Sequence, residues 1–303
     1  MKKWFRRNSV QEAIAGYTFL LPNLLGFILF TSLPVLASLL LSFMKWDLLS
    51  WPPRFVGFEN FIHLFQDPDF WKYCWNTVYL MMGIPLGMGG SLMLALFMNQ
   101  KLKGIVFFRT IYFLPTLCSG VAIFMLWRIM YNPEFGAINT MIAKFGTMIG
   151  LNLQGPNWLN DEAWAKPALI LMGVWQSIGG YNMILYLAAL QGVPRELYDA
   201  AEVDGANSWQ KFWAVTWPQI SPTTFFIAIM SVIGGFQGGF DSARIMTGGG
   251  PNGSTTTIIY ELYNNAFVWY KMGYAAAIAW VLFVIVFIFT LLQWRFYGNK
   301  VHY

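Results

Sequence analysis

Long runs without a charged residue constrain this chain more than any other feature of its sequence. The first run lies between Glu12 and Lys45 and holds only apolar and uncharged polar residues. A helix needs about 20 apolar residues to cross the hydrocarbon core of a bilayer. The sequence therefore predicts an all-α polytopic membrane protein, a single domain over residues 1–303, with six transmembrane helices. We expect these spans near residues 14–43, 73–98, 107–130, 167–190, 223–240 and 272–294.

The third and first runs differ in length from the others. The third, Thr110–Leu126, is short between charges, but apolar residues flank it, and Arg109 and Arg128 can reach toward water from its ends. We therefore expect one span there. The first run is longer than the apolar core of a signal peptide, about 7–15 residues, so we expect a retained membrane anchor.

The composition excludes most classes of soluble protein. Hydrophobic residues make up 57% of the chain and charged residues 11%, whereas soluble domains carry about a quarter charged residues. The net charge of +5 is spread over the connections between spans, so we expect no nucleic-acid partner. Cys74 and Cys118 have no metal or redox spacing, and the chain contains no GxxxxGK[ST] phosphate-binding loop. We expect no metal, no cofactor and no catalysis on this chain.

The distribution of Lys and Arg predicts which ends of the spans face the cytoplasm. One side carries eleven of these residues and the other eight, and four of the eleven precede the first span, which usually decides the orientation. We therefore expect a multi-pass protein with both termini and the segment 195–222 in the cytoplasm. The eleven are Lys2, Lys3, Arg6, Arg7, Lys101, Lys103, Arg109, Arg195, Lys211, Arg295 and Lys300, and the eight are Lys45, Arg54, Lys72, Arg128, Lys144, Lys166, Arg244 and Lys271.

A polar, acid-rich segment, residues 195–222, interrupts the membrane pattern between the fourth and fifth runs. Pro194 stands ahead of a first short helix, where a missing N–H is tolerated, and Glu196 and Asp199 favour the N-terminal end of that helix. Gly205 can end the helix with a positive φ. By helical spacing, one face of this helix would present Leu197, Ala200, Ala201 and Asp204.

A second short helix is expected after Gly205. Asn207 or Ser208 can cap its start with a side-chain oxygen. Pro218 and Pro222 are expected to limit it, because proline has no N–H and its ring clashes with the preceding turn of a helix. The segment 195–222 is thus predicted to be folded, which suggests that another protein docks there.

This segment resembles the signature loop of ABC importer permeases, in which Glu-Ala-Ala is followed at fixed distances by Gly, Ile and Leu-Pro. The corresponding residues are Asp199-Ala200-Ala201, Gly205, Val215 and Trp217-Pro218, with the spacing intact and Asp, Val and Trp in place of Glu, Ile and Leu. In that family the loop is the coupling helix that seats in a cleft of the ATPase subunit. The resemblance implies that the ATPase-coupling residues are Glu196, Leu197, Asp199, Ala200, Ala201, Asp204, Gly205 and Pro218.

Other stretches resemble the carbohydrate branch of this family, which includes the maltose and glycerol-3-phosphate permeases. They are residues 20–43, residues 55–77 and the TGGGP motif at 247–251. The resemblance implies a type I ABC importer permease in a bacterial or archaeal cytoplasmic membrane, carrying a sugar or related polyol. It also implies a second permease subunit as a heterodimer partner, an extracytoplasmic solute-binding protein, and two ATPase subunits that bind ATP and Mg.

A pathway for a polyol needs polar and aromatic side chains inside the membrane, because amides and carboxylates bind hydroxyls and sugar faces stack on rings. Polar residues inside a span are costly and therefore indicate function. Tyr181 also aligns, by the resemblance, with a substrate-contacting tyrosine of the maltose permease. The substrate-binding residues are expected among Trp175, Gln176, Tyr181, Asn182, Phe236, Gln237 and Asp241.

Alternative functions make different demands on the spans. A secondary transporter or channel without an ATPase partner would need ionisable groups at mid-span, and the centres of the runs are almost free of charge. A membrane-embedded enzyme would need paired carboxylates, a His cluster or a Ser/His/Asp set, and none occurs within the runs. Within the ABC permeases, glycerol-phosphate esters remain the alternative to sugars.

Overall fold

The computed structural model describes residues 2–47, 51–100 and 103–297. Lys101 and Lys300, two of the eleven basic residues expected on the cytoplasmic side, lie outside the described residues. The described part is mainly helical and divides into two compact units. One unit comprises residues up to Gln66 together with Asn264–Trp280, and the other comprises Asp67–Tyr263 with the chain from Val281 onward.

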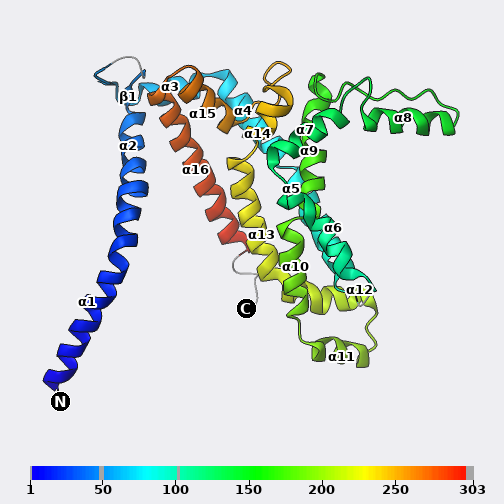
Figure 1. Ribbon diagram of the computed structural model, residues 1–303, viewed down its shortest axis with the longest axis horizontal. Helices are drawn as coiled ribbons and strands as arrows, with labels where there is room; N and C mark the ends of the chain where they lie inside the picture. Colours follow the sequence, from blue (N-terminus) through cyan, green and yellow to red (C-terminus); the bar gives the residue numbers. More distant parts are fainter. Residues whose placement is uncertain (1, 48–50, 101–102, 298–303) are drawn as a thin grey trace. The chain divides into compact units, whose positions relative to one another are not determined.

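The first unit is built around a long N-terminal helix (Figure 1). Its elements are α1 (Lys2–Phe27), a π-helix (Ile28–Ser32), α2 (Leu33–Ser42), β1 (Met44–Lys45), β2 (Arg54–Phe55), α3 (Glu59–Gln66), a π-helix (Asn264–Val268) and the start of α16 (Met272–Tyr297). The two short strands pair antiparallel, with Met44 opposite Phe55. The side chain of Asn60 fixes this turn by donating to the carbonyl oxygens of Ser42 and Met44 at 2.8 and 3.0 Å.

The second unit contains the remaining helices. They are α4 (Pro68–Leu80), α5 (Gly83–Met98), α6 (Ile105–Leu117), α7 (Gly120–Met130), α8 (Ala137–Met148), α9 (Glu162–Ile178), α10 (Tyr181–Gln191), α11 (Arg195–Val203), α12 (Ser208–Lys211), a π-helix (Phe212–Thr216), α13 (Trp217–Gln237), α14 (Phe240–Ser242), a π-helix (Ala243–Thr247), α15 (Ile258–Tyr263) and the rest of α16.

The helices of the described chain confirm the predicted membrane architecture. Five are long and apolar enough to cross a bilayer: Val10–Ser42, Pro68–Met98, Glu162–Gln191, Ser208–Gln237 and Met272–Arg295. The pair α6 and α7 is together long and apolar enough to make a sixth, but the two helices are bent by 97° relative to each other. The expectation of one span over 107–130 therefore describes a broken helix. Pro115 cannot donate to the helix and Cys118 is extended, so the helix ends at Leu117 and restarts at Gly120.

Small residues let α5 approach α9 closely. A Cβ atom on Gly87 would lie 2.7 Å from Oγ of Ser177, and one on Gly90 would lie 2.6 Å from a side-chain carbon of Ile178. Ser91 adds an interhelical hydrogen bond from its hydroxyl to the carbonyl oxygen of Ser177 at 2.9 Å. This is how helices associate in a membrane, where apolar surface gains little from leaving lipid.

The prediction that Pro218 and Pro222 limit the second loop helix is wrong. α12, the π-helix Phe212–Thr216 and α13 form one continuous helix over Ser208–Gln237. The wide π-turn contains Ala214, the residue whose carbonyl the Pro218 ring would otherwise meet, so the helix passes the proline. Pro222 cannot donate to the Pro218 carbonyl, and the hydroxyl of Ser221 donates to that oxygen instead at 2.8 Å.

Candidate functional site

A cavity of about 380 Å³ lies within the second unit, among α5, α9, α13 and α14. Its lining is mainly apolar but contains two amides, Gln176 and Gln237, and one carboxylate, Asp241. Asp241 is its only charged residue within the described chain. Hydroxyl groups add further donors and acceptors, from Thr77, Ser177, Ser231, Ser242 and Thr257.

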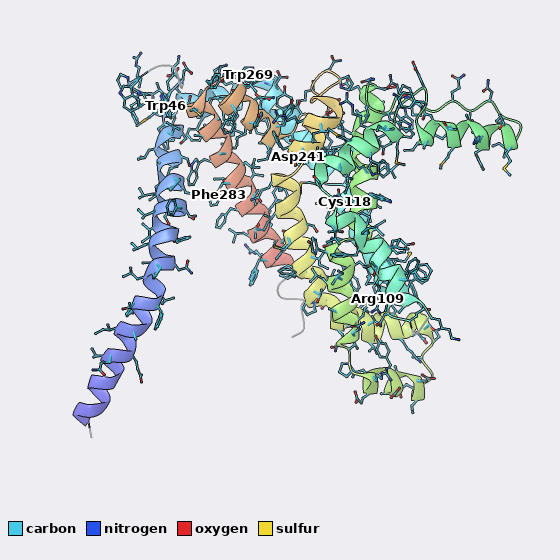
Figure 2. The ribbon with its side chains drawn as sticks, viewed as in Figure 1. Trp46, Arg109, Cys118, Asp241, Trp269 and Phe283 are labelled. Carbon is cyan, nitrogen blue, oxygen red and sulfur yellow. The ribbon has the colours of Figure 1, made fainter. Side chains whose placement is uncertain are left out.

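Helix breaks expose polar backbone and side chains around this cavity. α13 ends at Gln237, and Gly239 adopts φ +83 before α14 begins. α9 ends at Ile178, before the pair Gly179-Gly180. Figure 2 shows Asp241 where α14 follows α13, and Cys118 at the break between α6 and α7. Irregular backbone within a membrane is tolerated where it lines a cavity, and the residues at these breaks do line one.

A second, more open pocket of about 540 Å³ adjoins the first through shared lining residues. Gln176 and Ser177 line both pockets, while Tyr181 and Asn182 line only the second of the two. The side chain of Tyr181 is 65% exposed and its ring lies edge-on to Phe113. Gln176 and Asn182, six positions apart, therefore face one common pocket because the helix breaks between them.

Two of the sequence-predicted residues line neither pocket. Phe236 is only 1% exposed and packs with its ring centroid 5.2 Å from that of Phe289. Trp175 lies edge-on to Trp127 at 5.5 Å. The buried Phe236 ring is therefore not available to a molecule in the cavity, whereas Trp175 is 44% exposed but lies outside the linings of both pockets. The structure thus brings together Gln176, Gln237 and Asp241, adds Tyr181 and Asn182 nearby, and leaves Trp175 and Phe236 outside.

The loop that carries the TGGGP motif supplies Thr257 to the lining of the cavity. The sequence did not predict this contribution. The side chain of Thr257 packs against Gly239, where an added Cβ would lie 2.8 Å from its Cγ2. Asn76 on α4 holds the loop by donating to the carbonyl oxygens of Gly253 and Thr256 at 2.8 and 3.0 Å. Lys166 donates in turn to Oδ1 of Asn76 at 3.2 Å. No local signal in the sequence reveals contacts between residues about 180 positions apart.

The segment 195–222 contains two helices joined at Gly205, as predicted. Only the predicted end of the second helix at Pro218 and Pro222 differs, because that helix continues into α13. Gly205 has φ +75, and the N–H groups of Gly205 and Ala206 donate to the carbonyls of Glu202 and Ala201, which is the Schellman ending of a helix. Asn207 is the cap of the second helix, and its side chain and that of Gln210 form a complete capping box.

Two side-chain contacts tie α11 to the following helix. Lys211 forms a salt bridge with Glu202 at 2.8 Å, and its hydrogen bond lowers the pKa of the Glu202 carboxyl. Tyr198 shares a hydrogen bond with Oγ1 of Thr216 at 2.9 Å. α11 is therefore held as a defined surface beyond the ends of α10 and α13 (Figure 1).

The predicted coupling residues fall into two groups. Ala201 is half-buried against the core cluster that includes Met183, Tyr186 and Ile220, and Pro218 is half-buried in α13. The others are exposed on α11 and at its end: Glu196, Leu197, Asp199, Ala200, Asp204 and Gly205. The exposed group is the part of the loop that can contact another protein.

A family model described as "Binding-protein-dependent transport system inner membrane component" matches residues 76–297. The chain is 37% identical to a probable ABC transporter permease, YurN, of Bacillus subtilis strain 168, over 95% of this chain and 97% of that protein. It is 31% identical to the sn-glycerol-3-phosphate transport system permease UgpA of Agrobacterium fabrum, over 96% and 97%. It is also 31% identical to the arabinooligosaccharides transport system permease AraP of B. subtilis strain 168, over 94% and 89%.

The fold is similar to that of a chain in the crystal structure of a bacterial ABC transporter involved in the import of the acidic polysaccharide alginate. The TM-score is 0.83, the sequence identity is 24%, and the match covers 100% of both chains.

Proposed function

This chain belongs to the family of inner membrane components of binding-protein-dependent transport systems, and we propose that it carries a neutral sugar or related polyol through the cavity described above. As a member of this family it is a transport subunit of an ABC importer. We also propose which residues contact this cargo and which partners drive its transport.

The lining of the cavity carries the proposal for the cargo. Gln176 and Gln237 offer both amide donors and carbonyl acceptors, and Asp241 offers an acceptor, which together suit the hydroxyl groups of a sugar. The apolar majority of the lining suits the carbon faces of the ring. Among the described lining residues there is no Lys or Arg to neutralise an anion. The similarity to AraP, named for arabinooligosaccharides, supports the same class.

A glycerol-phosphate ester is the second candidate. The similarity to UgpA over nearly the whole chain favours it. A phosphate group would need a cation or a helix N-terminus in its path, and Asp241 would repel it. The N-terminus of α10 at Gly180 and Tyr181 opens into the second pocket, so this pocket is where such an ester would have to bind.

We further propose that the exposed residues of α11 seat in one of two ATPase subunits, which bind ATP and Mg. Small residues such as Ala200 and Gly205 allow another backbone to approach closely. A second permease subunit would complete the translocation pathway, and an extracytoplasmic solute-binding protein would deliver the cargo, as the family description implies.

The basic N-terminal residues and the position of α11 support an orientation with both termini in the cytoplasm. A reporter joined after the last residue should then be active only on the cytoplasmic side, and one inserted at Asn157 only on the other side. A reporter at Asn157 that is active in the cytoplasm would reverse the orientation.

Uptake by the complete reconstituted importer tests the cargo class. Gln237→Ala is expected to reduce uptake of a neutral oligosaccharide while basal ATP hydrolysis continues, since the lost hydrogen bonds act on the cargo alone. Gln219→Ala is the matched control, because Gln219 lies on the same helix, is exposed and does not line the cavity. Preferential uptake of glycerol 3-phosphate that is unaffected by Gln237→Ala would reject the sugar proposal.

A further inference from the structure

The helix α8 presents three distinct sides. Asn139, Ile142 and Gly146 face the protein and are buried or half-buried. A second side is apolar and exposed, with Met141 68%, Phe145 58% and Met148 85% exposed. By helical spacing the third side carries the exposed polar residues Thr140, Lys144 and Thr147.

Contacts with the protein fix the rotation of this helix about its own axis. The side chain of Asn139 donates to the carbonyl oxygens of Pro133 and Pro156 at 3.3 and 3.2 Å, and accepts from Nε1 of Trp158 at 2.7 Å. At Gly146 an added Cβ would lie 2.7 Å from the carbonyl oxygen of Leu151. The apolar side therefore cannot turn inward to become buried in the chain.

The position of α8 along the spans is also defined. α8 starts after the end of α7 at Met130 and lies before the start of α9 at Glu162, at the end of the α9–α10 span opposite α11. In Figure 1 it runs across the direction of α9. An aromatic cluster anchors this level: Trp158 lies 5.5 Å from Tyr131 and 5.2 Å from Trp164 between ring centroids. Trp and Tyr concentrate where a membrane meets water.

We propose that α8 lies in the membrane–water boundary, with Met141, Phe145 and Met148 inserted among the lipid chains and Thr140, Lys144 and Thr147 in water. A helix at this level with one apolar and one polar side takes that orientation. The lipid bilayer that surrounds the spans continues up to this boundary, so it covers the apolar side without any further partner. α8 would then hold the end of α9 at a constant depth while the cavity beside α9 opens and closes.

The test uses the complete importer in lipid nanodiscs, with single cysteines in a Cys74→Ala, Cys118→Ser background. An environment-sensitive fluorophore is attached at Met141→Cys or Met148→Cys, and at Thr140→Cys or Thr147→Cys as matched controls on the polar side. We expect a nitroxide-labelled phosphatidylcholine to quench the first pair several-fold more than the second, and aqueous cobalt ions to do the reverse.

Two results would overturn the proposal. Equal quenching of both pairs by aqueous cobalt would mean that the apolar side is in water. Protection of the Met141 and Met148 positions from both quenchers would mean that a protein covers this side, either the second permease or the binding protein. Because the proposal does not depend on the cargo, it stands or falls independently of the sugar assignment.

Discussion

The hydroxyl of Tyr198 lies 2.9 Å from Oγ1 of Thr216, and this hydrogen bond joins α11 to the π-helix that directly precedes the N-terminal end of α13. Thr216 is only 5% exposed, and α13 continues without a break from there to Gln237 in the cavity. A displacement of α11 can therefore pass along one helix to the cavity. Together with the salt bridge between Glu202 and Lys211, this hydrogen bond connects the surface proposed to meet an ATPase to the helix that reaches the site proposed to meet the cargo.

Tyr198→Phe removes this hydrogen bond but keeps the ring. The change should cost about 1 kcal/mol of stability. We expect assembly and basal ATP hydrolysis to persist, while stimulation of hydrolysis by the loaded binding protein falls several-fold. Tyr17→Phe is a suitable control, since Tyr17 is 74% exposed on α1. Full stimulation in Tyr198→Phe would show that motion is transmitted by another contact.

Gly87→Ala should destabilise the contact between α5 and α9, because the added methyl would lie 2.7 Å from Oγ and 2.9 Å from Cβ of Ser177. Overpacking of this kind costs about 1–3 kcal/mol. Gly89→Ala, two residues away with nothing within 4 Å of its added Cβ, should be neutral or slightly stabilising. Thermal unfolding of the purified protein in detergent measures both, and an equal effect of the two changes would contradict the packing described here.

Phe236→Ala should act on stability rather than on the cargo. Its ring is buried against Phe289, and removal of a buried ring costs about 3 kcal/mol or more. Phe226→Ala on the same helix removes a ring that is 52% exposed and should have little effect. Unchanged thermal stability together with lower cargo affinity in Phe236→Ala would contradict this interpretation and would indicate that Phe236 contacts the cargo.

The sequence predicted the parts of the fold that depend on composition and local signals. Charge-free runs locate spans because a bilayer demands apolar length, and Gly205 was recognised because a helix end needs a positive φ. The helix breaks after Leu117, near Pro115, but continues past Pro218 through a π-turn. In which of these two ways the backbone accommodates a proline cannot be predicted from the sequence alone. The direction of Phe236 depends on the rotation of α13 against α16.

In the candidate site, too, local sequence signals predicted some residues, while contacts between distant parts of the chain could not be predicted. Gln176, Gln237 and Asp241 were recognised because polar residues are costly inside spans, and the structure places all three around one cavity. Thr257 and its support by Asn76 depend on contacts between distant parts of the chain. The amphipathic pattern of residues 137–148 can be read from the sequence, but the choice of which side meets the protein cannot.

ATP hydrolysis by the assembled complex tests the central claim most directly. Ala200 is exposed on α11 and lies in the surface proposed to seat in the ATPase, so Ala200→Trp should block seating without disturbing the fold. Ala143→Trp, at an exposed alanine on α8, is the matched control at the opposite end of the spans. We predict that Ala200→Trp leaves the protein inserted but abolishes hydrolysis stimulated by the loaded binding protein, whereas Ala143→Trp retains it. Normal stimulated hydrolysis in an assembled Ala200→Trp complex would contradict the account.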